Sequence, residues 1–548
     1  MNGSWPRPGW RELLLLLLIT AIGVARIVST YRVFSATFDE PVHLESGIEW
    51  IQFGRLSFNQ MHPPLSRAFI AAGPYLHGVR WQNKADWKAE GIAELHSQRD
   101  YWHTLALARA GVLPFFVLAV LATWWLARRI FGPEVALLAA AALTLLPPFL
   151  AHAGLATTDL AVAASIPVVV LAGLDWLDDP SPGATVWLGA ACGLAVLLKF
   201  SALVFVPACL LAMLLAKLLI EPRPARRRWE PSKPYALATV GAAVTAFLEL
   251  WAGYRFHVGT PDSIQLGGLK LGELVPPGVA GLPIVPAPEF WTGVLTVIWY
   301  NRIAIPAYVL GDVVPGGTWY FFPVALGVKT PLAFLCLAFV GALVAAHAAW
   351  THRRWSFAVA PAVALALLAA AMTNHIALGL RHLLPIYPLL AILVGVGFAS
   401  LWHRRGGTRR WRVAAGLLAG WLLVASLRAD PDYLSSFNEI ASSQPEHFLL
   451  SSDLDYGQDV GRLADTLRAQ AIDSLTAYLF AFPDEELLSS LKHVTYVDWR
   501  VATPSATGWV AASALILRTL PGMEWLRRRT PAVRVGTSIY LYYVPPGP

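Results

Sequence analysis

Long apolar runs recur along this chain as far as residue 428, and they limit its fold more than any other feature. Candidate membrane spans lie near residues 12–31, 105–127, 134–153, 160–177, 184–199, 202–220, 235–256, 320–350, 355–375, 383–402 and 411–428. A helix that crosses the hydrocarbon core needs about 20 mostly apolar residues. Only 14% of the 548 residues are charged, whereas soluble proteins carry about 25%. The sequence therefore predicts a polytopic α-helical membrane protein with about 11 spans.

Arginine clusters between these runs indicate how the spans are oriented. The clusters lie within residues 128–129, 223–228, 353–354 and 404–412, in every second connection along the chain. Connections rich in Lys and Arg stay on the cytoplasmic side of a membrane. The pattern predicts a multi-pass protein with a cytoplasmic N-terminus and an extracytoplasmic C-terminus. The Ala-, Leu- and Arg-rich composition is compatible with a bacterial plasma (inner) membrane.

Other interpretations of the basic residues and cysteines are less favoured. A net charge of +7 would suggest nucleic acid in a soluble protein, but here the basic residues stand between apolar runs. We therefore expect no nucleic-acid partner. The three cysteines lie inside apolar runs without metal-ligand spacing, which is typical of small buried residues. The N-terminal run is similar to a signal peptide, but it resumes at Ile27 and Val28, so we expect an uncleaved span.

Three longer segments fall on the predicted outer side of the membrane. They are residues 32–104, 257–319 and 430–548. The last segment is more polar, contains strand-like stretches at 494–497 and 539–543, and is long enough for a small folded domain. We predict a transmembrane domain over residues 1–429 and an extracytoplasmic α/β domain over residues 430–548.

Polar residues gather on this predicted outer side. They are Asp39, Glu40, His43, Glu45, His62, Asp159, Lys199, Asn374, His375, Arg381, His382, Asp453, Asp455 and Asp459. Random placement would scatter such groups over both faces. Charged groups near a bilayer are costly, so their convergence on one face predicts a functional site there.

Several of these residues also have a purely structural interpretation. Asp39 and Glu40 are suited to cap an interfacial helix, with Pro41 in its first turn. The prolines after His62 would form a rigid turn by themselves, and Lys199 has the place of a snorkelling residue at a helix end. A functional interpretation is favoured for the acidic pair, because a distant set of basic residues lies on the same face.

The sequence lacks the motifs that mark several classes of enzyme. The sequence has no complete P-loop, no G-x-G-x-x-G at a strand–helix junction, no G-x-S-x-G and no H-E-x-x-H. ATP hydrolysis, hydride transfer and zinc proteolysis therefore have no sequence support.

A set of short motifs does carry a resemblance to a known family. In chain order they are Asp39-Glu40, His62-Pro63-Pro64-Leu65, Thr157-Thr158-Asp159, Lys199-Phe200-Ser201, Arg381-His382-Leu383-Leu384-Pro385, Phe437-Asn438-Glu439 and Leu454-Asp455-Tyr456-Gly457-Gln458-Asp459. With these motifs the chain resembles the bacterial branch of the family 39 glycosyltransferases. That branch is similar to protein O-mannosyltransferases and to aminoarabinose lipid A transferases. The resemblance covers almost the whole chain and implies a GT-C fold with a transmembrane catalytic domain.

The resemblance also implies roles for individual residues. Asp39 would be the general base or would orient the acceptor, with Glu40 as a supporting carboxylate. Some relatives have a lysine at the position of His62, so phosphate binding there depends on the charge of a histidine. The expected lipid-phosphate-binding residues are His62, Lys199, Arg381 and His382. The expected substrate-binding residues are Asp159, Asp455, Tyr456 and Gln458.

The resemblance implies a sugar donor carried on a polyprenyl phosphate and transfer to a hydroxyl group outside the cytoplasm, with inversion at the sugar. The expected partners are this lipid-linked sugar, membrane lipids, and an acceptor that is a protein, a lipid or a glycan. No cofactor is certain. A divalent metal held by the carboxylates and His43 stays an open alternative, since nothing in the spacing demands one.

Two further functions compete with this enzyme. A transporter or flippase of lipid-linked sugars would place ionisable residues near span centres, whereas most ionisable residues here lie at the outer ends. A scaffold with a partner-binding tail would leave the one-sided set of Asp39, Glu40, Lys199 and Arg381 unexplained.

Overall fold

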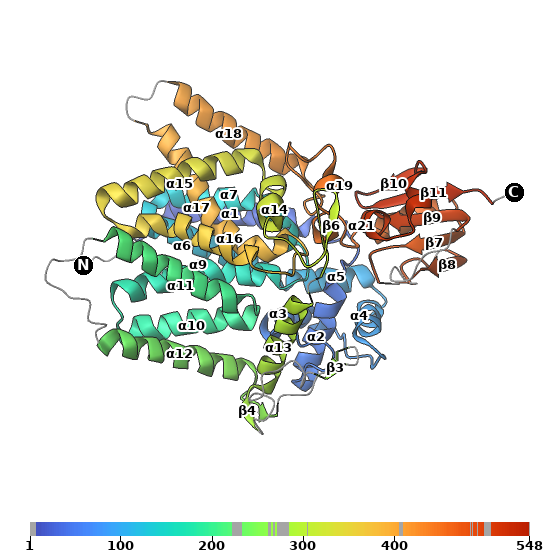
Figure 1. Cartoon of the computed structure of the whole chain (residues 1–548), viewed down its shortest axis with the longest axis horizontal. Coiled ribbons are helices and arrows are strands. Elements are labelled where there is room, and N and C mark those ends of the chain that lie inside the picture. Colours follow the sequence, from blue (N-terminus) through green and yellow to red (C-terminus); the bar gives the residue numbers. More distant parts are fainter. Residues whose placement is uncertain are drawn as a thin grey trace.

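A computed structural model of the chain describes residues 7–546 with interruptions. It leaves out residues 222–232, 261–264, 267–268, 271–283, 304, 405–408, 483, 485, 490 and 498–505. Within the described part, a bundle of apolar helices occupies most of the length of the molecule, and a small sheet lies at the end where the chain terminates (Figure 1).

The bundle is built from the apolar runs. Its helices are α1 (Trp10–Val28), α6 (Leu113–Phe131), α7 (Pro133–Thr144), α8 (Pro147–Ala153), α9 (Asp159–Asp178), α10 (Pro182–Leu198), α11 (Ala202–Ile220), α12 (Lys233–Gly253), α15 (Leu332–His352), α16 (Val359–Met372), α17 (Tyr387–Trp402) and α18 (Arg409–Arg428). α9 is buried along almost its whole length, whereas α12 and α18 expose most of their apolar residues. Exposed apolar side chains on outer helices are expected where lipid replaces water.

Eight helices in the described part are long and apolar enough to cross a membrane, or nine if the pair α7 and α8 is one span. α10 is apolar but shorter than these. α1 is long enough, but it carries Arg11, Glu12 and Arg26. The predicted class, a polytopic helical membrane protein with a small C-terminal α/β domain, is confirmed.

Two predicted spans differ from continuous helices. The run 134–153 bends by 67° between α7 and α8, where Pro147 and Pro148 begin the second helix. The run 320–350 divides into α14 (Phe321–Lys329) and α15, because Pro331 lies between them. Helices usually end before a proline, and the sequence signal was therefore present in both runs.

The segments predicted to lie outside the membrane, called the outer segments below, fold into short helices and hairpins. The first contains α2 (Glu40–Phe53), α3 (Pro64–Leu76) and α4 (Trp87–His96), followed by α5 (Tyr101–Ala110), which leads into α6. The second contains α13 (Pro288–Arg302), the hairpin of β5 (Ala307–Val309) and β6 (Asp312–Val314), and the short strands β1 (Val258–Gly259), β2 (Gln265–Leu266), β3 (Leu269–Lys270) and β4 (Val285–Pro286). Pro at the start of α2, α3 and α13 fits the first helical turn, where no backbone donor is needed.

A five-stranded sheet forms the C-terminal unit. Its order is β10 (Val533–Val535), β11 (Ile539–Val544), β9 (Gly508–Ser513), β7 (Ser474–Tyr478) and β8 (His493–Tyr496). β7 pairs in parallel with both β8 and β9, and the other pairs are antiparallel. The helices of this unit are α20 (Val460–Ala469), α21 (Ala514–Thr519) and α22 (Glu524–Arg527). α20 packs Leu463 and Leu467 against β7 and β11 in one apolar core.

The segment before α20 belongs with the bundle. Tyr433, Leu434, Ala441, Leu449 and Tyr456 are buried in the apolar core that the membrane helices share. The separate core of the C-terminal unit begins at Val460. The predicted division at residues 429 and 430 stays a prediction, and the packing shows that residues 433–456 contribute side chains to the transmembrane core.

Candidate functional site

Asp39, Arg381 and Tyr456 meet where the first outer segment contacts the bundle. Asp39 precedes α2, Arg381 lies in the short helix η3 (Leu380–Ile386), and Tyr456 lies in the loop before α20. Arg381 Nη1 lies 2.5 Å from Asp39 Oδ2, and the Tyr456 hydroxyl lies 2.6 Å from the same oxygen. The side chain of Asp39 is 23% exposed and that of Arg381 is 9% exposed, so the carboxylate is partly exposed while its partner is shielded.

The environment of Asp39 favours its charged form. Burial alone would raise the pKa of this carboxyl, but the charge of Arg381 and the hydrogen bonds from Tyr456 and Arg381 hold the pKa below its ordinary value. A carboxylate that is ionised at neutral pH and open to solvent can accept a proton from a bound hydroxyl group.

A second carboxylate connects Arg381 to Lys199. Asp159 Oδ1 lies 2.5 Å from Lys199 Nζ, and its Oδ2 lies 3.8 Å from Arg381 Nη1. Asp159 begins α9 and Lys199 ends α10, so each charge stands at the helix end whose dipole stabilises it. Arg381 Nε has no hydrogen-bond partner in the described part of the chain. That buried donor is free to bind an anionic oxygen.

His62 is brought to the same site by the turn before α3. Its Nδ1 lies 3.3 Å from Thr158 Oγ1, and its ring meets the ring of His43 edge to face at 5.0 Å. Burial lowers the pKa of His43 to about 3 and lowers the pKa of His62 well below its ordinary value. His62 is therefore neutral at neutral pH and can donate one hydrogen bond to a phosphate, but it adds no positive charge.

Glu40 faces away from Asp39 into a fully buried ion pair. Its two oxygens lie 2.8 Å from Nε and Nη2 of Arg109, and it also accepts hydrogen bonds from the amides of Thr37 and Ala156. Arg109 donates further bonds to the backbone oxygens of Tyr31, Phe34 and Ser35. This pair fixes the loop that carries Asp39. Glu40 therefore supports the site through its contact with Arg109.

Asp453 holds the backbone that presents Arg381. Its carboxylate oxygens lie 3.0 and 3.2 Å from the amide nitrogen of Leu380, at the first turn of η3. Lys329, at the end of α14, donates hydrogen bonds to the backbone oxygens of Leu434 and Asp453 at 2.7 and 2.6 Å. All these atoms are buried, and they fix the position of η3 against the loop that carries Tyr456.

The remaining predicted site residues have hydrogen-bond partners within the protein. His382 Nδ1 lies 3.0 Å from the backbone oxygen of Ile376. Asp455 accepts a hydrogen bond from the amide of Leu515 at the start of α21. Gln458 accepts one from the amide of Tyr456 and donates one to the oxygen of Leu454. Asp455 and Gln458 thus shape the loop around Tyr456, and their predicted contact with substrate stays a prediction.

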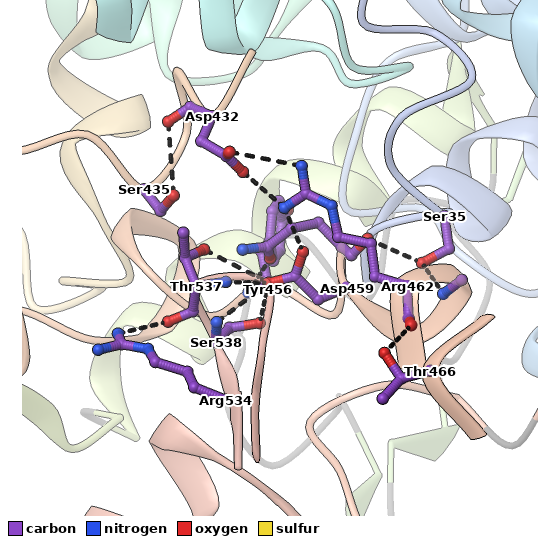
Figure 2. A network of polar contacts seen from close by, with 12 residues as sticks. Ser35, Asp432, Ser435, Tyr456, Asp459, Arg462, Thr466, Arg534, Thr537 and Ser538 are labelled. Atoms are coloured by element: carbon purple, nitrogen blue, oxygen red, sulfur yellow. Dashed lines mark hydrogen bonds and ion pairs between the residues drawn. The ribbon is translucent and has the colours of Figure 1, made fainter. Parts of the chain in front are cut away.

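Figure 2 shows the network that fastens this loop to the C-terminal unit. Asp459 Oδ2 accepts hydrogen bonds from the amides of Thr537 and Ser538 at 2.9 and 3.0 Å. Its Oδ1 lies 2.9 Å from Arg462 Nη1, which also pairs with Asp432 at 2.7 Å. The network ties the turn between β10 and β11 to α20 and, through Asp432, to the end of the bundle.

The described residues contain no group of three or more His, Cys, Asp or Glu side chains arranged to hold a metal ion. Asp39 and Asp159 are instead partnered by the cationic side chains of Arg381 and Lys199. The carboxylates nearest the site therefore fit an arrangement with side-chain cations, and we assign no step to a metal.

Sequence patterns alone did not point to Arg109, Arg67, Lys329 or the role of Asp453. Arg109 lies inside a predicted span, which is itself a signal because a charge there requires a partner. Arg67 is fully buried and holds the turn before α3 through bonds to the backbone and side-chain oxygens of Asn59. Its short-range partners leave no pattern in the sequence that points to this role.

Comparisons with known proteins agree with the resemblance seen in the motifs. Residues 104–251 match the family model of dolichyl-phosphate-mannose-protein mannosyltransferase. The predicted resemblance to glycosyltransferases of this kind is confirmed. The matched segment contains Asp159 and Lys199, while Asp39, Arg381 and Tyr456 lie outside it. A comparison with curated proteins found no significant match.

Among solved structures, the chain is similar to ArnT from Cupriavidus metallidurans bound to undecaprenyl phosphate. The identity is 15%, the match covers 96% of this chain and 97% of the other, and the TM-score is 0.48. It is also similar to the archaeal oligosaccharyltransferase AglB from Archaeoglobus fulgidus in complex with an inhibitory peptide and a dolichol-phosphate. There the identity is 14%, the match covers 88% of this chain and 64% of the other, and the TM-score is 0.49.

Proposed function

We propose that this protein transfers a sugar from a polyprenyl-phosphate carrier to a hydroxyl group of an acceptor at the outer face of a bacterial plasma membrane. The observation that carries the proposal is the pairing of an open carboxylate, Asp39, with a shielded guanidinium, Arg381, at 2.5 Å. The match of residues 104–251 to the mannosyltransferase family model supports the same reaction class. The acceptor is a protein, a lipid or a glycan.

The proposed reaction is one displacement that inverts the anomeric carbon. The acceptor oxygen forms a bond to that carbon while the bond from the carbon to the phosphate oxygen breaks. The acceptor proton passes to Asp39, and the bonding electron pair leaves with the polyprenyl phosphate. General base catalysis of this kind contributes about 10²–10⁴-fold to the rate.

Arg381 and Lys199 would stabilise the charge that develops on the leaving phosphate. Arg381 keeps its Nε donor unused among the described residues, and its guanidinium can bind two phosphate oxygens at once. Lys199 lies 2.5 Å from Asp159, so the carboxylate holds the ammonium in place while the phosphate binds. The shielded position of Arg381 strengthens this attraction, because little water screens the charges.

The ion pair between Asp39 and Arg381 also suggests an order of binding. While Arg381 is paired with Asp39, part of the basicity of the carboxylate is used in the pair. A donor phosphate that binds Arg381 would compete with Asp39 for the guanidinium and would leave the carboxylate free for the acceptor. The donor would then bind before the acceptor becomes reactive.

The test is a transfer assay with purified full-length protein in detergent. A panel of polyprenyl-phosphate-linked, radiolabelled sugars serves as donors, and membrane extract serves as the source of acceptor. We expect label to enter the acceptor with wild-type protein and to be lost with Asp39→Asn. Failure of every donor with folded wild-type protein, or equal transfer by the variant, would contradict the proposal and would favour a lipid-sugar flippase.

A further inference from the structure

A cleft of about 380 Å³ lies between the first outer segment and the C-terminal unit. It opens to solvent, and more polar than apolar surface lines it. The side chains that matter to its chemistry are Arg32, Asp100, Trp102, Asp465 and Arg468. None of these residues belongs to the site around Asp39, and the volume falls in the range of about 300–1,000 Å³ typical of small-molecule sites.

One wall of the cleft is a face of α20. Gly461, Asp465 and Arg468 line the cleft with the spacing of residues that share one side of a helix. Leu463 and Leu467, on the other side, are buried in the core of the C-terminal unit. α20 therefore uses its apolar side for folding and presents its polar side to the cleft.

The opposite wall is the start of α5, with Trp102. The ring of Trp102 lies so close to α20 that a Cβ added at Gly461 would be 3.0 Å from its Cη2 atom. One carboxylate oxygen of Asp100 caps α5 through the amide of His103 at 2.9 Å. Because Gly461 has no side chain, the indole of Trp102 can approach α20 closely. The indole therefore forms part of the floor of the cleft.

The walls are held together by buried contacts. The amide of Gly461 donates a hydrogen bond to Ser35 Oγ at 3.2 Å, and the amide of Ser35 donates one to the oxygen of Gln458. The network of Asp459 and Arg462 fixes the first turn of α20 to the sheet and to Asp432 (Figure 2). A cleft with fixed walls loses little entropy when a ligand binds.

The charges in the cleft are balanced. Arg468 pairs with Asp465 at 2.5 Å, and both side chains are mostly exposed, at 60% and 73%. Arg32 lies just beyond α1 and has no carboxylate partner among the described residues. Two arginines and two aspartates around one indole offer donors and acceptors for hydroxyl groups, and the indole offers an apolar face for the C–H groups of a sugar ring.

Two neighbouring segments, residues 35–38 and 456–461, connect the cleft to Asp39. The amide of Phe38 donates a hydrogen bond to the oxygen of Tyr456 at 2.9 Å, and Ser35 pairs with Gln458 and Gly461. Residues 35–38 therefore run beside residues 456–461, with the cleft at one end and Asp39 at the other. A chain-like ligand in the cleft would be held next to the loop that carries the proposed base.

We propose that this cleft binds a saccharide chain and that it holds the remote part of a glycan acceptor. The second half of this proposal rests on the proposed transferase function, whereas saccharide binding itself does not. An anionic polymer would require a surplus of basic residues, which the balanced cleft does not offer. An extended peptide would require a free sheet edge or an apolar groove, and α20 and α5 offer neither here.

The first experiment measures equilibrium binding to purified full-length protein in detergent. The probes are neutral hexasaccharides of glucose, mannose, galactose and N-acetylglucosamine. We expect saturable binding of at least one probe and a loss of affinity of about tenfold or more in Arg468→Gln and in Arg32→Gln. Both side chains are exposed, so neither substitution should impair folding. Arg529→Gln, which changes another exposed arginine of the C-terminal unit, is the matched control and should bind like wild type.

The outcomes separate this proposal from the proposed function. Absence of binding by every probe, equal affinity in the two cleft variants, or binding of a Ser- and Thr-containing peptide in place of saccharide would overturn the cleft proposal. Sugar transfer without saccharide binding would also overturn it and would leave the transferase intact. Saccharide binding without any transfer would support the cleft as a saccharide site and would contradict the transferase.

Discussion

Arg381 organises the proposed site because it contacts both of its carboxylates. Its Nη1 atom lies 2.5 Å from Asp39 and 3.8 Å from Asp159, and its guanidinium carbon lies 5.0 Å from the centre of the Tyr456 ring. Loss of one member of a buried pair leaves the other charge without compensation. The neighbouring carboxylate, Glu40, belongs to a separate pair with Arg109. Substitution of Asp39 should therefore affect the protein differently from substitution of Glu40.

Asp39→Asn and Glu40→Gln form a matched test of these two roles. Asp39→Asn should lower turnover by about 10²–10⁴-fold because it removes the base. Glu40→Gln should instead lower the free energy of unfolding by about 3–5 kcal/mol, because it leaves Arg109 buried without its counter-charge. Transfer assays and thermal unfolding in detergent measure the two effects. Equal loss of stability in both variants would contradict the separation.

The pH dependence of turnover should report the environment of Asp39. Its folded-state pKa is lowered, so the carboxylate form and the activity it supports persist as the pH falls, until the pH reaches that lowered pKa. As the pH falls, kcat/KM should therefore begin to decrease only below a pH of about 4, which is the ordinary pKa of an Asp carboxyl. Tyr456→Phe removes a hydrogen bond to the carboxylate, so this decrease should move to higher pH. A decrease that stays in place or moves to lower pH would argue against this assignment.

The short helix η3 carries Arg381 and depends on a residue that is distant in the sequence. Asp453 accepts the amide hydrogen bond of Leu380 at 3.0 Å, and Lys329 holds the backbone of Asp453 from α14. The first amides of a helix have no partner within the helix, so a side-chain acceptor there fixes its start. Asp453 is therefore a positioning residue for Arg381.

Substitution of Asp453 should change activity through this position. Asp453→Ala should lower kcat by about 10²-fold, the cost of a misplacement of about 1 Å at a reacting group. Asp453→Asn keeps one acceptor oxygen and should restore most of the activity. Steady-state kinetics of both variants, with thermal unfolding as control, measure the difference. A loss in Asp453→Asn as large as in Asp453→Ala would contradict the positioning role.

Sequence patterns predicted the helices of the bundle better than they predicted which side chains contact one another. The apolar runs predicted the spans, and the proline breaks at residues 147 and 331 were visible but not used. The motifs containing Asp39, Asp159, Lys199 and Arg381 predicted a shared site, because topology alone places their ends on one face. The pairing of Glu40 with Arg109 could not be predicted, since their contact depends on how α2 and α5 pack.

The whole molecule combines a bundle of apolar helices with a sheet at its end (Figure 1), and the network of Asp459, Arg462 and Asp432 joins the two. The orientation with the sheet outside stays a prediction. Asp459 is fully buried and bonds to the Thr537–Ser538 turn and to Arg462, so it fixes the sheet to the start of α20.

Asp459→Ala should therefore weaken the C-terminal unit. We expect the free energy of unfolding to fall by about 3–5 kcal/mol, since the substitution leaves the turn amides without their acceptor and leaves Arg462 with Asp432 alone. Asp432→Ala removes the half-exposed partner of the same arginine and should cost less than about 1 kcal/mol. Limited proteolysis of residues 460–546 measures the difference. Equal protection of the two variants would show that Asp459 does not anchor the sheet.

Donor binding and single-turnover transfer, measured on the same protein samples, distinguish the roles of Asp39 and Arg381. Wild-type, Asp39→Asn and Arg381→Gln proteins are titrated with the polyprenyl-phosphate sugar that wild type uses, and then mixed with acceptor. Asp39→Asn should bind the donor at least as tightly as wild type, because it no longer competes for Arg381, but it should transfer about 10²–10⁴-fold more slowly. Arg381→Gln should lose donor affinity. Loss of donor affinity in Asp39→Asn, or unchanged affinity in Arg381→Gln, would contradict the assignment of base and phosphate-binding cation.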